Sequence, residues 1–92
     1  TMLAPGKSAA ADGLSFDIAA YCQQVADTAG GSYAIEKGCR ENERQARSWA
    51  RRTTVSAQID RYCRDVAGTV GGSYSIYKGC VENERRARDS MN

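Results

Sequence analysis

Residues 71–85 of the chain are GGSYSIYKGCVENER, and residues 30–44 are GGSYAIEKGCRENER. Each stretch follows a Tyr-Cys-x-x-Val segment, at Tyr21–Val25 and at Tyr62–Val66, and matched positions are 41 residues apart. All four cysteines lie at matching places inside this repeat. The sequence therefore predicts one structural unit that is built twice.

Each repeat has the period of an amphipathic helix on both sides of its Gly-Gly pair. Glycine accepts the left-handed conformation that ends helices, and serine is a good N-cap, so one helix should end at Gly30-Gly31 and the next should begin at Ser32. The residues of the two stripes recur in steps of three and four. In the first repeat they are Ile18, Cys22, Val25 and Ala29, then Ile35, Cys39, Asn42, Ala46 and Trp49. We predict an antiparallel helical hairpin in each repeat.

The cysteines are placed to pair within each hairpin. Cys22 lies eight residues before Gly30, and Cys39 lies eight residues after Gly31. Residues equidistant from the turn of an antiparallel hairpin lie at the same height, which brings the two thiols within disulfide range. The predicted bonds, Cys22–Cys39 and Cys63–Cys80, should each contribute roughly 3 kcal/mol. A zinc site is the alternative, although zinc ligands usually come as C-x-x-C pairs and this sequence has none.

The predicted fold is all-α: two disulfide-stapled antiparallel helical hairpins, in tandem repeat, packed as a small four-helix unit. Residues 1–14 are rich in Ala, Gly and Ser and show no apolar period, which predicts a disordered N-terminal leader. Residues 15–92 should form a single α-helical domain made of two repeats, 15–49 and 56–90.

Serines also indicate where the helices of the two repeats begin. Ser15 is the expected N-cap of the first helix, and Ser56 is the expected N-cap of the third. The linker between the repeats, Ala50 to Val55, leaves two arrangements open. Either it separates the hairpins, or the second and third helices join into one long helix.

Composition narrows the classes of function. The net charge is +2, from 13 basic and 11 acidic residues, which is too balanced for electrostatic binding to nucleic acid. There is no histidine, so the commonest general base is missing and we expect no enzyme. No apolar run approaches the roughly 18 residues of a membrane span. Four cysteines in a short chain favour a periplasmic or secreted protein over a cytosolic one with free thiols.

Oxygen-bearing side chains point to a hard-cation site in the second hairpin. Carboxylate and amide oxygens suit calcium-like or trivalent ions. On the helical pattern, Asp60 and Glu84 fall on adjoining flanks of the two helices. Residues equidistant from the turn lie at the same height, and this height rule places Asp60 opposite Asn83. The first repeat has Ala19 in place of Asp60 but keeps Glu43 as a further candidate. The predicted metal ligands are therefore Asp60, Glu84, Asn83 and Glu43.

The same residues have a second explanation. Arg64 follows Asp60 by four residues, and Arg88 follows Glu84 by four, so ordinary ion pairs on solvated helix faces account for both acids. Asn83 lies on an otherwise apolar stripe, as does the asparagine of the first repeat. A buried amide at these positions would fix the register of the helices.

The pattern Tyr-Cys-x-x-Val, Gly-Gly-Ser-Tyr-x-Ile and Gly-Cys-x-Glu-Asn-Glu covers both repeats, from about residue 15 to 90. It resembles small exported cysteine-repeat proteins of alphaproteobacteria. In size, export and composition the chain is also similar to the landiscernin family, the small periplasmic lanthanide-binding proteins of methylotrophs. That resemblance implies a metal at an exposed site and dimerisation through it. It carries over no individual ligand residue.

The leading functional prediction is a small exported protein that holds a hard cation, a lanthanide(III) by preference or calcium, at a surface carboxylate site. No organic cofactor is expected. Open coordination positions would admit water or a second protomer, which would give a metal-bridged homodimer. Asp60 and Glu84 would be charged ligands, with Asn83 as a neutral ligand or an orienting neighbour.

The alternative is a metal-free structural or protein-interaction module of the cell envelope. Duplicated helical hairpins often serve only to present a surface. The contact candidates of such a module are Tyr33, Tyr74, Trp49 and Tyr77. A third hypothesis is an enzyme inhibitor on a rigid scaffold, for which the sequence offers no exposed reactive loop.

Overall fold

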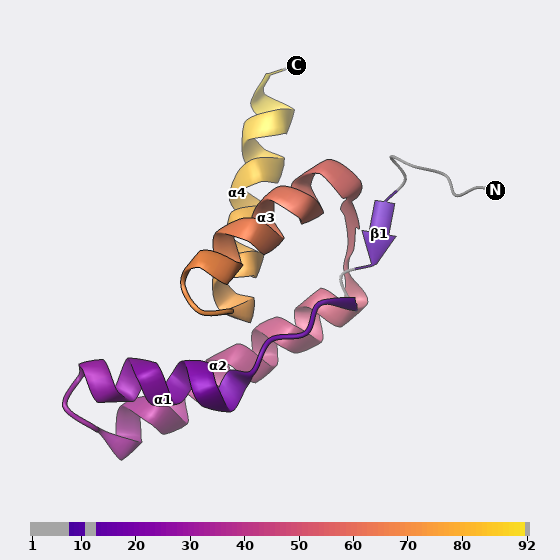
Figure 1. Cartoon of the computed structure of the whole chain (residues 1–92). Helices are drawn as coiled ribbons and strands as arrows, with labels where there is room; N and C mark the ends of the chain where they lie inside the picture. The colour runs from indigo at the N-terminus through magenta and orange to yellow at the C-terminus, as the bar shows by residue number, and fades with distance from the viewer. Residues whose placement is uncertain (1–7, 11–12, 92) are drawn as a thin grey trace.

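Four helices and two short strands make up the part of the chain, residues 8–10 and 13–91, that the structure describes; it is a computed structural model (Figure 1). The elements are, in order, β1 (Ser8–Ala10), α1 (Ile18–Thr28), α2 (Tyr33–Arg52), β2 (Thr54–Ser56), α3 (Ala57–Thr69) and α4 (Tyr74–Ser90). Helices α1 and α2 form hairpin 1, and α3 and α4 form hairpin 2. The all-α class and the two-hairpin architecture are confirmed. None of these helices combines the length and the apolar character needed to cross a bilayer.

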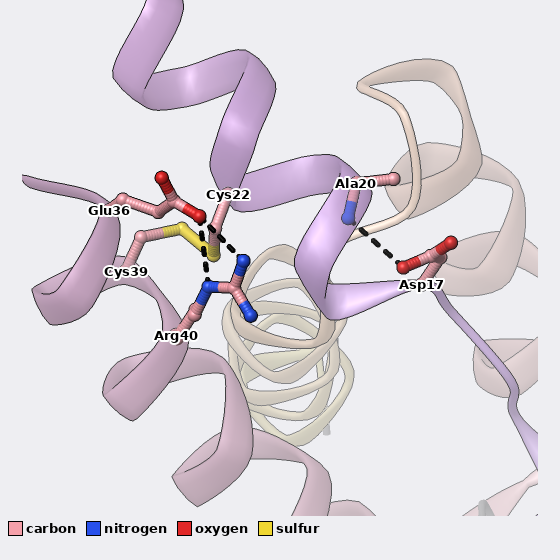
Figure 2. A network of polar contacts seen from close by, with 6 residues as sticks. All are labelled: Asp17, Ala20, Cys22, Glu36, Cys39 and Arg40. Atoms are coloured by element: carbon pink, nitrogen blue, oxygen red, sulfur yellow. Dashed lines mark hydrogen bonds and ion pairs between the residues drawn. A yellow bond between two sulfur atoms is a disulfide. The ribbon is translucent and has the colours of Figure 1, made fainter. Parts of the chain in front are cut away.

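Side-chain caps determine where the helices begin. Ser32 and Ser56 each accept a hydrogen bond from the backbone N–H three residues on, at 3.1 and 3.3 Å, so both predicted caps are confirmed. The cap predicted at Ser15 is wrong. Asp17 takes this role instead, and its Oδ1 accepts from a backbone N–H of the first turn at 3.0 Å (Figure 2). A carboxylate suits this position because the helix dipole favours negative charge at the N-terminus.

Both predicted disulfides are present. Cys22–Cys39 joins α1 to α2, as Figure 2 shows, and Cys63–Cys80 joins α3 to α4. The Cα atoms of each pair are 5.6 Å apart, which is an ordinary disulfide separation. All four cysteines are thereby used, so they do not form a zinc site.

The two hairpins meet through α2 and α4 and cross rather than forming a parallel bundle (Figure 1). The core lies between them and under the segments that lead into α1 and α3. Its buried residues are Leu14, Ala46, Ala50, Val55, Ile59, Cys63, Ala67, Tyr74, Tyr77 and Val81. The α1–α2 turn projects away from this core, and the molecule is elongated, at 47 × 32 × 21 Å.

Two connecting segments differ from the prediction. The segment 1–14, predicted to be a disordered leader, contributes β1, which pairs antiparallel with β2, and Leu14 is buried in the core. The β-branched Thr54 and Val55 favour an extended linker, whose edge offers hydrogen-bonding groups to β1. Residues 1–7 and 11–12 lie outside the described part of the chain. Strand β2 also separates α2 from α3, so these two helices do not join.

Candidate functional site

Glu43, one of the predicted metal ligands, lies inside the protein where the hairpins meet. It belongs to α2, and only 1% of the residue is exposed. Its carboxylate accepts hydrogen bonds from the Ser73 hydroxyl (2.7 Å) and the Tyr74 N–H (2.6 Å). It also accepts from the N–H (3.3 Å) and the hydroxyl (2.5 Å) of Ser75. These donors lie at the N-terminus of α4, where backbone N–H groups and the helix dipole favour an anion. Glu43 therefore joins hairpin 1 to residues 71–75, which we call the docked turn.

Tyr74 fixes the docked turn from a second side. Its hydroxyl accepts from the Phe16 N–H at 3.0 Å and donates to the Leu14 carbonyl at 3.3 Å. The rings of Phe16 and Tyr74 pack edge to face, with centroids 5.1 Å apart. Gly72 has a φ of +91°, and a Cβ there would lie 3.0 Å from the Phe16 ring, so glycine is required at this position. Hydrogen bonds, aromatic packing and a close backbone approach thus act together.

Asp60, a second predicted ligand, is also engaged within the protein. Its Oδ1 accepts from the Tyr77 hydroxyl at 2.6 Å, and its Oδ2 accepts from Arg64 Nε at 2.8 Å. Burial, and then the neighbouring Asp60 carboxylate, raise the pKa of the Tyr77 phenol above its ordinary range, so the phenol stays protonated and donates. The ion pair with Arg64, which the sequence offered as the alternative explanation, is present.

Asn83 and Glu84 are the predicted ligands that remain open. Asn83 is exposed and Glu84 is partly exposed, and neither side chain has a hydrogen bond or ion pair to another described residue. Both line a shallow groove of about 370 Å³ that Tyr62 also borders. The alternative explanation for Glu84, an ion pair with Arg88, is not seen, because Arg88 donates to Asp89 instead.

The four predicted ligands do not share one place in the structure. Asp60 lines a groove formed by α3 alone, whereas Asn83 and Glu84 line the groove between α3 and α4. Glu43 lies under the docked turn. Over residues 8–10 and 13–91, no group of three or more His, Cys, Asp or Glu side chains could hold a metal ion.

The buried stripe of α4 explains the difference from the prediction. It consists of Tyr74, Tyr77 and Val81, which face the neighbouring hairpin as well as α3. Asn83 lies off this stripe and is exposed, as is Asn42 on α2, so the predicted buried amide is wrong at both positions. A helix with two partners buries two faces, and the height rule takes account of only one partner.

Of the four aromatic contact candidates, Tyr33 is the one that is largely exposed, at 87%. Tyr74 and Tyr77 are buried. Trp49 packs edge to face against Tyr77, and Lys78 lies over the Trp49 ring, 5.9 Å from its centroid. Three of these rings therefore contribute to packing, and Tyr33 faces solvent near the α1–α2 turn.

Sequence reasoning missed Ser73 and Ser75, whose hydroxyls donate to Glu43. The sequence places Ser73 in a turn between two helices and offers Glu43 only as a candidate metal ligand. A signal was nevertheless present, because an N-cap serine marks a cluster of unpaired N–H groups that suits a carboxylate. The acid that reaches this cluster lies 30 residues earlier in the chain, and no local pattern reveals that contact.

Comparison with known proteins identifies no relative. No known protein family, no curated protein and no solved structure matches this chain. The function must therefore be argued from the residues of the two hairpins.

Proposed function

We propose that the protein is a small exported binding protein that holds a hard cation, a lanthanide(III) by preference or calcium, at the surface of hairpin 2. The observation that carries the proposal is the open carboxylate of Glu84, which has no internal partner among the described residues and adjoins the exposed Asn83. Carboxylate and amide oxygens are the ligands that such ions prefer. The resemblance to periplasmic lanthanide-binding proteins belongs to the same proposal.

Two side chains leave most of the coordination sphere open. A calcium ion takes roughly 6 to 8 oxygen ligands. Water, or oxygen atoms of a second protomer, would fill the other positions, and the second case gives a metal-bridged homodimer. Asp60 would join the ligand set only by exchanging Arg64 for the ion. Glu43 would have to give up its contacts with the docked turn, so we assign it to the junction of the hairpins.

The proposed compartment is the periplasm or the cell exterior, and the proposed role is binding rather than catalysis. The two disulfides support this location, because such bonds persist in oxidising compartments. They also hold the helices of each hairpin at a fixed separation. A rigid scaffold of this kind suits a binding surface, since less conformational entropy is lost when a ligand binds.

Titration of the oxidised protein with La³⁺ and with Ca²⁺, followed by calorimetry and light scattering, tests the proposal. Glu84→Ala should weaken binding at least about tenfold, because the main charged ligand is lost. Glu82→Ala, on the same helix but outside both grooves that Glu84 lines, is the matched control and should bind normally. A doubled mass on adding metal would support the metal-bridged homodimer. No heat and no change of mass with either ion would overturn the cation proposal.

The second candidate is a metal-free structural or protein-interaction module of the cell envelope. The observation that favours it is the exposure of Tyr33 near a turn that projects from the molecule (Figure 1). Tyrosine is enriched in protein interfaces, where its ring provides contact area and its hydroxyl a hydrogen bond. Self-association or partner binding that ignores added cations and is lost in Tyr33→Ala would favour this candidate.

A further inference from the structure

We propose that the turn of hairpin 1 docks onto hairpin 2 of a second copy of the chain, head to tail. The turn is residues 30–34, which we call the free turn. It would enter a second groove that Glu84 lines, of about 290 Å³ and distinct from the one that Glu84 shares with Asn83. This groove, which we call the Glu84 groove, is lined by Ser56, Gln58, Ile59, Glu84, Ala87, Arg88 and Met91. A contact of the same kind already exists inside a single chain, where the docked turn binds hairpin 1. The inference needs no metal ion and goes beyond the cation proposal.

The free turn repeats the docked turn in sequence and in conformation. Both contain two glycines of positive φ, +88° and +84° in the free turn and +100° and +91° in the docked turn. Ser32 caps α2 as Ser73 caps α4. Their surroundings differ, because Tyr33 is 87% exposed whereas Tyr74 is 3% exposed. The free turn therefore offers the N–H groups that receive a carboxylate in the docked turn, but no described residue supplies that carboxylate.

The Glu84 groove contains the counterpart of Glu43, the acid of hairpin 1 that binds the docked turn. The pairs of counterparts, each 41 residues apart, are Glu43 and Glu84, Ile18 and Ile59, Ala46 and Ala87, and Arg47 and Arg88. In hairpin 1, Glu43 and Ala46 are buried against hairpin 2. In hairpin 2, Ala87 is exposed and Glu84 has no polar partner in the described part of the chain. The serine-capped turn and the acid that binds it thus occur a second time, and both are open, whereas the counterpart of Phe16, which packs on Tyr74, is Ala57.

A single chain does not bring these two halves together. The free turn lies at the outer end of hairpin 1, and the C-terminal part of α4 lies at the opposite side of the molecule (Figure 1). Glu43 binds the docked turn, but Glu84 does not bind the free turn of its own chain, so the repeats are not related by a closed two-fold axis. A second copy must supply the missing half. Such a heterologous contact continues from copy to copy, as a ring or as an open chain.

Differences between the repeats make this contact weaker than the internal one. Ala34 lacks the hydroxyl of its counterpart in the docked turn, Ser75. Glu36 and Arg40 occupy the positions that correspond to the buried Tyr77 and Val81 of hairpin 2. The contact would rest on hydrogen bonds to Glu84 more than on apolar burial. Association should therefore be weak, in the high micromolar to millimolar range, since small polar interfaces rarely bind tightly.

Sedimentation of the full chain in EDTA, over a concentration series up to about millimolar, tests the proposal. The average mass should rise above the 10.0 kDa of one chain as the concentration increases. Tyr33→Ala and Glu84→Ala should each lower the association constant at least about tenfold, and Glu82→Ala should leave it unchanged. Both test residues are wholly or partly exposed, so the variants should fold, and circular dichroism checks this. The mass of one chain at every concentration, or association unaffected by both variants, would overturn the proposal.

Mixing the two variants tests the head-to-tail direction. Tyr33→Ala keeps an intact Glu84 groove, and Glu84→Ala keeps an intact free turn, so the mixture should form a one-to-one dimer although each variant alone stays monomeric. A mixture that stays monomeric, or that grows beyond a dimer, would contradict this geometry. The EDTA separates the two proposals: failure here leaves the cation titration standing, and a failed titration leaves this pairing standing.

Discussion

Hairpin 1 and hairpin 2 have the same sequence pattern and the same disulfide, yet their matching parts have different surroundings. The docked turn is buried against hairpin 1, whereas the free turn faces solvent. The acids differ in the same way, because Glu43 is buried at the junction and Glu84 lies in an open groove. The comparison teaches that the same local motif can be buried in one repeat and exposed in the other, according to what packs against it.

Two substitutions account for which hairpin presents its turn to the core. Tyr77 and Val81 on α4 correspond to Glu36 and Arg40 on α2. Tyr77 and Val81 are fully buried, whereas Glu36 and Arg40 form a partly exposed ion pair (Figure 2). Burying the ion pair would carry a desolvation cost, while burying tyrosine and valine is favourable. Hairpin 2 therefore turns this face inward, and hairpin 1 leaves it partly exposed.

Substitution of the two matched acids, Glu43 and Glu84, should give the largest difference in stability between the hairpins. Glu43→Gln should lower the free energy of unfolding by about 3 kcal/mol, because a buried carboxylate that accepts hydrogen bonds from three residues is lost. Glu84→Gln should change it by less than about 0.5 kcal/mol. Urea denaturation of dilute, oxidised protein measures both values. Similar values for the two variants would show that Glu43 does not hold the junction.

Substitution of a glycine in each turn should give the next largest difference in stability. Gly31→Ala should cost about 1 kcal/mol, because alanine disfavours the positive φ at this position. Gly72→Ala should cost about 2 to 3 kcal/mol, because its Cβ would also press against the Phe16 ring. Thermal or urea unfolding compares the two variants. Equal costs would mean that backbone strain alone decides, and that the Phe16 contact can relax.

Removing one hydroxyl from each turn sharpens the comparison further. Tyr74→Phe should lower the free energy of unfolding by about 1.5 kcal/mol, because the Phe16 N–H and the Leu14 carbonyl lose their partner. Tyr33→Phe should have no measurable effect, since this hydroxyl has no partner among the described residues. The same urea experiment measures both. A destabilised Tyr33→Phe variant would show that the free turn is not free in solution.

The smallest expected effect is a dependence of stability on pH that belongs to hairpin 2. Folding raises the pKa of the Tyr77 phenol above its ordinary value of 10.0, first by burial and then through Asp60. Above that pH the unfolded chain loses the proton while the folded protein keeps it. The contribution of the Tyr77 phenol to the free energy of unfolding is therefore fully present below pH 10. It falls as the pH rises, by about 0.8 kcal/mol at pH 10.5. Unfolding curves recorded across this pH range measure the effect. Tyr77→Phe is the control and should remove the slope of stability against pH. An unchanged slope in this variant would assign the effect to other groups.

Much of the fold was predictable because it depends on residues that are close in sequence. The helical period, the Gly-Gly pairs and the spacing of the cysteines specify each hairpin and its disulfide without reference to the rest of the chain. The strand β1 was not predictable, since a three-residue segment carries no pattern of its own and pairs with a distant linker. The cap at Asp17 was missed for a local reason, because Ser15 and Asp17 lie two residues apart and differ only slightly in capping ability.

The candidate site was less predictable than the fold. The height rule correctly paired the cysteines, but it placed Asp60 beside Asn83 and Glu84 because it considers α3 and α4 alone. In the structure Asp60 binds Tyr77, whose ring is buried in the core between the hairpins. A rule built on one helix pair cannot anticipate a side chain that is held by the packing of three helices.

By itself, the sequence determined two disulfide-linked helical hairpins with a serine-capped turn in each. Only the tertiary structure decided that Glu43 is buried under the docked turn and that Glu84 is open. Both acids lie in the same local sequence, Glu-Asn-Glu-Arg, so the residues directly beside them do not distinguish them. What distinguishes them is the surface packed against each, and burial depends on residues far away in the chain that bring that surface into contact.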